Sequence, residues 1–203
     1  LRPDLSNTWI ALAALKAAGV EADDPTVKAA MVFVKRCQNS SEVNDQKELA
    51  GEDGGAMYLP GETFGIDSSD PNGKKLFTST GSMTCAMIFA YLAGGVNKDD
   101  PPLHLALQWL GKNWSPERNP NSKKDGQEAL FYYYRVLAQT LLASGEKTVG
   151  GKAWAQELAG AIVKRQKEDG AWSNAVDRFT ESDPALATGY ALSALAACQQ
   201  AMK

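Results

Sequence analysis

The sequence predicts an all-α fold in which a ring of inner helices lies inside a ring of outer helices. Stretches nearly free of charged residues alternate along the chain with stretches whose apolar residues recur every three or four positions. Glycines and Asp-Pro pairs separate these stretches, as expected at helix ends. Few segments show the apolar–polar alternation of strands. The inner helices should therefore be apolar all round and the outer helices amphipathic.

Four stretches predict inner helices because almost no charged residue interrupts them. They begin near residues 5, 81, 127 and 184. Asp183 and Pro184 open the last of them, since Asp is a preferred N-cap and Pro at the first helical position loses no hydrogen bond. Asp125 and Glu128 resemble a capping box ahead of the third. We expect all four helices to be buried on every side.

Three further stretches predict outer helices with one apolar stripe each. They open at Asp24-Pro25, at Asp100-Pro101 and near residue 151, and the last should run through residues 151–167. Basic residues in the final turns of the first and third suit the negative end of the helix dipole. Each outer helix should cover the inner helices beside it.

The helix-ending positions predict a repeat of one helix pair. From Gly94 onward they recur about every 50 residues, which indicates stacked repeats within a single domain, 1–203. The first interval is longer because residues 39–78 form a polar insertion without sustained periodicity. Within it, Asp53-Gly-Gly-Ala-Met-Tyr58 resembles Asp169-Gly-Ala-Trp172. We interpret the two as the same inter-helix turn, delayed in the first by the insertion, where we expect ligand specificity to lie.

Composition excludes several classes of protein. A net charge of −3 argues against nucleic acid as a partner, because binding to phosphates needs clustered Lys and Arg. No apolar run reaches the roughly 20 residues that span a membrane. Cys37, Cys85 and Cys198 are too widely spaced for a zinc cluster and predict buried free thiols. The chain begins at Leu1 rather than Met, so an exported protein whose signal is missing here is one expectation.

The segment Gln166-Lys-Glu-Asp-Gly170-Ala-Trp172 resembles the Gln-Trp repeat motif of the terpenoid cyclases, which include squalene–hopene cyclase. Protein prenyltransferase β-subunits share the same α/α toroid. More narrowly, the chain resembles bacterial prenyltransferase/squalene-oxidase repeat proteins. The resemblance implies a toroid or partial barrel with a cavity open near the N-termini of the inner helices. It also implies that Gln166, Gly170 and Trp172 are structural and that the Gln and Trp tie neighbouring outer helices together.

The chain departs from these families at their catalytic positions. Cyclases that protonate a double bond carry Asp-x-Asp-Asp at the entry to an inner helix, where this chain has Glu181-Ser-Asp183-Pro184. Asp183 falls at the central acid. The prenyltransferases need Asp, Cys and His around zinc, and this chain has a single histidine, His104. The sequence therefore predicts neither an intact cyclase site nor a zinc site, and no metal or cofactor.

Several residues are still candidates for chemistry or binding. Asp183 is a possible general acid, although a plain N-cap explains it as well. Asp4 and Asn7 occupy the same end of the first inner helix and have the same alternative. Tyr132, Tyr133 and Tyr134 could form an aromatic cavity wall or pack against the outer layer. Thr188 and Tyr190 could contact a ligand or bond within the protein; they lie mid-way along the last inner helix.

Two functions follow from these residues. The first is a repeat module that binds an apolar or glycan-like small molecule, or a protein, in its central concavity. The alternative is an enzyme of the terpenoid-cyclase or prenyltransferase type that uses Asp183 as its acid beside the tyrosine wall.

Overall fold

The computed structural model describes residues 2–203 and is mostly α-helical, as predicted. Two short antiparallel strand pairs are the only paired strands in this part of the chain, and the sequence had not indicated them. The elements are α1 (Leu5–Ala17), α2 (Pro25–Arg36), β1 (Ser68–Ser69), β2 (Lys75–Leu76), α3 (Gly81–Ala93), α4 (Pro101–Asn113), α5 (Lys123–Gly126), α6 (Leu130–Ser144), β3 (Thr148–Val149), β4 (Lys152–Ala153), α7 (Trp154–Lys164) and α8 (Pro184–Ala201).

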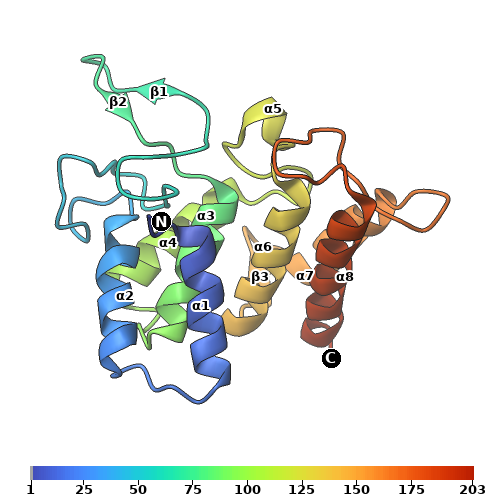
Figure 1. The fold of residues 1–203 in the computed structure, drawn as a ribbon, viewed down its shortest axis with the longest axis horizontal. Helices are drawn as coiled ribbons and strands as arrows, with labels where there is room; N and C mark the ends of the chain where they lie inside the picture. The colour runs from blue at the N-terminus through green and yellow to red at the C-terminus, as the bar shows by residue number, and fades with distance from the viewer. Residues whose placement is uncertain (1) are drawn as a thin grey trace.

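The four charge-free helices form a row in chain order. Helix α1 packs against α3, α3 against α6, and α6 against α8. The amphipathic helices lie outside this row: α2 contacts α1 and α3, α4 contacts α3, and α7 contacts α6 and α8. The N-terminal ends of the row meet at one edge of the molecule, where the long connecting segments also gather (Figure 1). This edge is where side chains from distant parts of the sequence come together.

Aspartates at the helix starts explain why three of the helices begin where they do. The carboxylates of Asp4, Asp24 and Asp183 accept hydrogen bonds from backbone N–H groups in the first turns of α1, α2 and α8. Pro25 and Pro184 occupy the first helical position of α2 and α8. These starts match the predicted ones.

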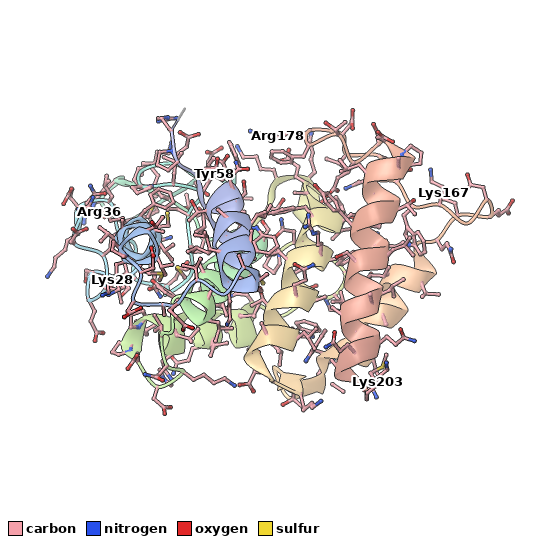
Figure 2. All side chains as sticks on the ribbon, turned by 60° about the horizontal axis from the view of Figure 1, so that its bottom comes forward. Lys28, Arg36, Tyr58, Lys167, Arg178 and Lys203 are labelled. Carbon is pink, nitrogen blue, oxygen red and sulfur yellow. The ribbon has the colours of Figure 1, made fainter. Side chains whose placement is uncertain are left out.

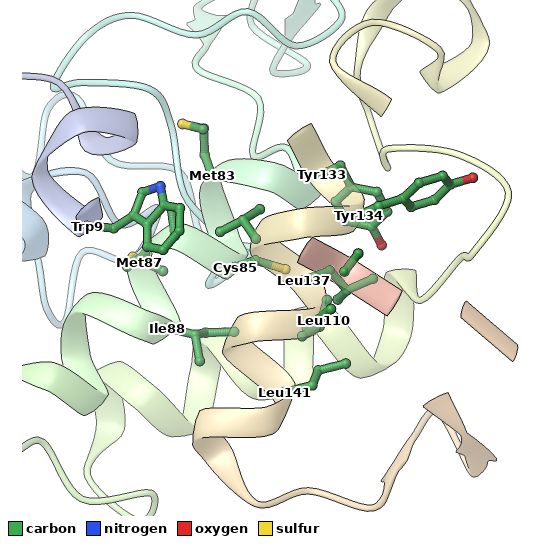
Figure 3. Packing of buried hydrophobic residues seen from close by; sticks show 14 of the residues in the cluster. Trp9, Met83, Cys85, Met87, Ile88, Leu110, Tyr133, Tyr134, Leu137 and Leu141 are labelled. Carbon is green, nitrogen blue, oxygen red and sulfur yellow. The ribbon is translucent and has the colours of Figure 1, made fainter. Parts of the chain in front are cut away.

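The core is one buried cluster that takes side chains from all seven longer helices. Figure 3 shows part of it, with Leu137 and Leu141 of α6, Cys85 of α3 and Leu110 of α4. The three cysteines are free and buried, which confirms that prediction. Burial is the cause that raises the pKa of the Cys85 thiol well above its ordinary value. No helix within residues 2–203 is long and apolar enough to cross a membrane.

The prediction that all four inner helices are buried on every side is wrong for α1 and α8. Side chains of α3 and α6 are buried nearly all round. By contrast, Ile10 of α1 is 40% exposed and Leu192 of α8 is 54% exposed. The reason is position: α1 and α8 end the row, so no further helix of the described chain covers their outer faces.

Two predicted helix starts are also corrected. Helix α6 begins at Leu130 rather than near 127, because Asp125 and Ala129 adopt left-handed backbone conformations (φ 54° and 55°). Asp125 therefore caps nothing, and the proposed capping box with Glu128 does not form. Helix α7 begins at Trp154 rather than near 151, because β3 and β4 form a hairpin directly before it.

The two turns that the sequence analysis equated make the same hydrogen bonds. The carboxylates of Asp53 and Asp169 each accept from the backbone N–H two residues on, both at 2.9 Å. Gly54 and Gly170, which follow them, both have φ of +83°. A glutamine closes each turn: Gln38 Nε2 donates to the Gly54 carbonyl at 3.0 Å, and Gln166 Nε2 to the Gly170 carbonyl at 2.8 Å.

The match extends to the following inner helix and corrects one expectation. Ala56 N–H donates to Thr84 Oγ1 of α3, and Trp172 N–H to Thr188 Oγ1 of α8, both at 3.1 Å. Gln166 bonds within its own turn, and Trp172 Nε1 donates to the Ile162 carbonyl of α7 at 2.8 Å. These bonds tie one hairpin to itself. They do not join neighbouring outer helices, as the resemblance had implied.

Candidate functional site

A pocket of about 450 Å³ lies at the N-terminal ends of α1, α3, α6 and α8. Its wall combines these helix ends with three connecting segments, residues 58–64 of the insertion, residues 119–129 before α6 and residues 178–181 before α8. In Figure 2, Tyr58 and Arg178, from the first and last of these segments, lie at the same edge of the molecule. The pocket therefore draws on parts of the chain more than 100 residues apart, which only the tertiary fold brings together.

Five of the side chains that line the pocket are aromatic. Tyr58 and Phe64 pack with ring centroids 4.5 Å apart, and Phe64 lies 5.7 Å from Phe179 across the first and last connecting segments. On the opposite wall, Tyr132 of α6 meets Tyr190 of α8 edge to face at 6.1 Å. Met83 and Ala129 are the only aliphatic side chains in the wall among residues 2–203. The pocket is thus bounded by rings and polar groups.

Glu181 is a buried acid of this wall, only 1% exposed, with both oxygens hydrogen-bonded. Oε1 accepts from the Tyr132 N–H and Oε2 from Asn174 Nδ2, both at 2.8 Å. Burial raises the pKa of Glu181, against the opposing effect of the hydrogen bonds from Asn174 and the first turn of α6. Because it accepts N–H groups that the start of a helix leaves unpaired, Glu181 joins the segment before α8 to α6.

Glu128 is a second buried acid of this wall and is 6% exposed. Unlike Glu181, it has hydrogen-bond partners on its backbone but not on its carboxylate. Its backbone carbonyl accepts hydrogen bonds from Ser122 Oγ and Asn119 Nδ2, which hold this residue in place before α6. Its side-chain Oε2 is buried and has no hydrogen-bond partner within residues 2–203. The nearest cation, Arg178, lies 3.7 Å away, too far for a hydrogen bond. A buried carboxylate oxygen without a donor needs an explanation.

Arg178 lies over the rings at the mouth of the pocket. Its guanidinium carbon lies 4.8 Å from the centroid of Phe64 and 5.3 Å from that of Phe179, within the range of cation–π attraction. The side chain is 42% exposed. It therefore presents a positive charge and several N–H donors beside Glu128.

The backbone of the wall is strained at two residues. Ala129 and Thr180 have φ of 55° and 63°, in the left-handed region that residues with a Cβ atom seldom adopt. Thr180 is the more unusual because its side chain is branched at Cβ. Strain of this kind costs about 1–3 kcal/mol and is concentrated at functional sites. Each of the two residues is next in sequence to a buried acid, Glu128 or Glu181.

The structure separates the three candidate tyrosines. Tyr132 lines the pocket, where its hydroxyl accepts from Trp9 Nε1 at 2.9 Å. Tyr133 is fully buried and donates to the Ser115 carbonyl at 3.0 Å, on the side of the outer layer. Tyr134 is also fully buried and packs edge-on against Phe131. Of the three tyrosines, Tyr132 lines the cavity as expected. Tyr133 and Tyr134 instead pack in the protein interior, which was the alternative.

The other candidates lie beside the pocket or away from it. Asp183 is exposed, and its carboxylate accepts from the Ala185 N–H at 2.8 Å as a plain N-cap. Asp4 caps α1, where hydrogen bonds from Ser6 and Asn7 lower its pKa against the opposing effect of burial. Thr188 accepts from the Trp172 N–H. Tyr190 lines the pocket.

Sequence reasoning missed most of the polar wall. Glu181 had been noted only as a replacement within a motif, and Glu128 only as part of a capping box. No periodicity marks Phe64, Arg178 or Phe179, because they lie in connecting segments. One usable signal was present: Arg178-Phe-Thr-Glu181 places a cation, a ring and an acid directly before the Asp-Pro that opens α8.

No group of three or more His, Cys, Asp or Glu side chains is placed to hold a metal ion in residues 2–203. Comparison of the chain with family models, with curated proteins and with solved structures finds no match.

Proposed function

We propose that the chain is an α/α-toroid type of repeat module that binds a small organic molecule in the pocket at the N-terminal ends of its inner helices. Two observations support the toroid arrangement. The inner helices pack in chain order with the amphipathic helices outside them. The turns before α3 and α8 also share a set of hydrogen bonds, as two copies of one structural repeat would.

The observation that carries the binding function is Glu128, a buried acid in the wall of a pocket of about 450 Å³, whose Oε2 accepts no hydrogen bond within residues 2–203 and is paired only with Arg178 at 3.7 Å. Burying an ionised carboxylate without a donor costs folding free energy. Left-handed backbone at the neighbouring Ala129 adds a further cost. A ligand that donates a hydrogen bond to Glu128 would offset both of these free-energy costs. The volume lies within the range of small-molecule sites, so a small molecule fits better than a protein segment.

One observation favours the alternative of an enzyme of the cyclase type. Glu181 is a buried acid in the pocket, and burial raises its pKa, as a general acid requires. In such an enzyme Glu181 would replace Asp183, which is exposed and lies outside the pocket wall. Both Glu181 oxygens are already bonded to the protein, however, and the wall offers little aliphatic surface to a terpenoid chain. Binding therefore remains the better supported function.

A matched pair of variants tests the site. Ser6 is half-buried and lines the pocket, whereas its neighbour Asn7 is exposed and lies outside the wall. Ser6→Trp should fill the cavity, and Asn7→Trp should leave it open. A small-molecule library is screened against the wild type by thermal shift and ligand-observed NMR. A true ligand at about 100 times its Kd should stabilise the wild type and Asn7→Trp by about 2.7 kcal/mol and Ser6→Trp by much less.

Two results would contradict the proposal. Compounds that stabilise all three proteins equally would bind elsewhere on the molecule. A screen without any compound that distinguishes a folded Ser6→Trp from the wild type would remove the pocket as a binding site. Circular dichroism of both variants shows whether they are folded.

A further inference from the structure

We propose that Glu128 and Arg178 together recognise two adjacent hydroxyl groups of a neutral, polyhydroxylated ligand, that is, a saccharide. This inference rests on the proposed function and names the chemical class that the pocket takes. It makes Glu128 the acceptor and Arg178 the donor of one recognition pair, at the end of the pocket where the connecting segments meet the start of α6.

Glu128 supplies a carboxylate that forms an ion pair with Arg178 but accepts no hydrogen bond within residues 2–203. The residue is 6% exposed, lines the pocket, and accepts no side-chain hydrogen bond within residues 2–203. Ser122 and Asn119 hold its backbone carbonyl at 2.8 and 3.2 Å, which fixes where the side chain begins. An ionised carboxylate is an acceptor only, so the missing group on the ligand is an O–H or N–H.

Arg178 supplies donors that are held in place. The guanidinium lies over the rings of Phe64 and Phe179, while none of its N–H groups donates a hydrogen bond within the described chain. A guanidinium carries five N–H donors and no acceptor. The 3.7 Å between Arg178 Nη1 and Glu128 Oε2 leaves the pair unjoined by a hydrogen bond. Neighbouring hydroxyls of a sugar match this arrangement, since one can donate to Glu128 while the next accepts from Arg178.

The rest of the wall suits several further hydroxyls. Thr80, Thr180 and Tyr190 line the pocket, and their hydroxyl groups make no hydrogen bond within residues 2–203. The ring of Tyr58, packed against Phe64 at 4.5 Å, adds an apolar surface to the same wall. Hydroxyls around the wall and rings at one end fit a sugar better than an unbroken hydrocarbon.

A cationic ligand fits less well, although aromatic rings and carboxylates are typical of sites for organic cations. The rings at the mouth already carry the Arg178 guanidinium, which also lies nearest to Glu128. A second cation would have to displace Arg178 from both. A neutral ligand hydrogen-bonds to Glu128 and Arg178 where they are.

Titration with defined probes tests the inference. The probes are D-glucose, D-galactose, N-acetyl-D-glucosamine, cellobiose and maltose, with choline and agmatine as cationic probes and cyclohexanol as an apolar one. Calorimetry, or NMR titration for millimolar affinities, gives Kd for the wild type, Glu128→Leu, Arg178→Leu and the exposed control Glu168→Gln. At least one saccharide should bind the wild type and the control, and each leucine variant should weaken it roughly 10- to 100-fold.

Stability provides a second readout that separates recognition from a structural role. Because Glu128 is buried without a donor, Glu128→Leu should unfold at the same or a higher urea concentration than the wild type while it binds saccharide less. A loss of binding that accompanies a large loss of stability would instead assign Glu128 to the structure and overturn the inference.

The remaining outcomes are distinct from failure of the proposed function. Saccharide binding that survives both leucine variants would leave the pocket as the site and remove this pair as its recognition element. A cationic probe that binds more tightly to Arg178→Leu than to the wild type would make the site a cation site. If no saccharide binds while library compounds still distinguish Ser6→Trp from Asn7→Trp, the pocket stands and the ligand class is wrong.

Discussion

The turn before α3 and the turn before α8 share their hydrogen bonds but differ in their surroundings. Gln38, which closes the first, is fully buried, whereas Gln166, which closes the last, is exposed. Gln38 Nε2 donates to the Pro102 carbonyl as well as to Gly54, and its Oε1 accepts from the Tyr91 hydroxyl at 2.7 Å. The Gln166 side chain makes only the hydrogen bond to Gly170 within the described chain.

Neighbouring helices account for the difference. The first turn lies under α4: a Cβ atom on Gly54 would come within 3.0 Å of the Leu105 carbonyl, and one on Gly55 within 2.9 Å of Trp109. Nothing comparable covers the last turn, where the nearest atom to a Cβ on Gly170 is 3.9 Å away. The same local geometry therefore occurs in a buried turn before α3 and in an exposed turn before α8. The two turns thus share their hydrogen bonds, while the neighbouring helices set what those bonds contribute to stability.

The largest difference is expected from the two glutamines. Gln38→Ala should lower the free energy of unfolding by about 2–4 kcal/mol, because it leaves buried carbonyl and hydroxyl groups unpaired and opens a cavity. Gln166→Ala should cost less than about 1 kcal/mol, since water can replace its single bond. Urea unfolding of both variants beside the wild type measures this. If both variants lost the same free energy of unfolding, the hydrogen bond to the glycine carbonyl would account for the stability, and the burial of Gln38 would add nothing.

Alanine substitution of the two glycines should give a smaller difference in unfolding free energy between the two turns. Gly54→Ala and Gly170→Ala both place a Cβ atom at φ of +83°, which costs about 1–2 kcal/mol. Gly54→Ala should cost about 1 kcal/mol more, because its Cβ also presses on Leu105. Thermal and urea unfolding report both values. A Gly170→Ala variant as damaged as Gly54→Ala would indicate that the last turn is covered in solution.

The smallest effect is expected from the acid that follows the last turn. Residues 54–80, after the first turn, hold no buried acid, whereas Glu181 is buried. Burial raises the pKa of Glu181 above its ordinary 4.5, so the folded state binds its proton more tightly than the unfolded state. Its contribution to stability is therefore present below about pH 4.5 and is lost as pH rises through the raised pKa.

Glu181→Gln isolates this contribution. The free energy of unfolding of the wild type minus that of Glu181→Gln should fall from pH 4 to pH 8, because the unfolded state releases this proton at a lower pH than the folded state does. Urea unfolding across this range, with the exposed Glu168→Gln as control, measures the difference. A difference that stays constant or grows with pH would show that the hydrogen bonds to Glu181 outweigh its burial.

Local signals in the sequence predict most of the helices and which of them are amphipathic. Aspartate caps, glycine stops and the spacing of apolar residues act within a few residues of one another, so the starts of α1, α2, α3, α4 and α8 could be read directly. The equivalence of the turns at Asp53 and Asp169 was visible for the same reason. The start of α6 was misplaced because left-handed residues before it follow tertiary constraints rather than local preference.

Which side chains meet depends on how distant segments pack. The outer faces of α1 and α8 are exposed because these helices end the row. Their amino-acid composition does not distinguish them from the buried helices α3 and α6. The pocket joins residues 58–64, 128–132 and 178–181, and long-range packing brings them together. Hence Glu128 and Glu181, rather than the predicted Asp183, are the acids in its wall. Capping is a local interaction, whereas a shared cavity depends on where distant segments pack.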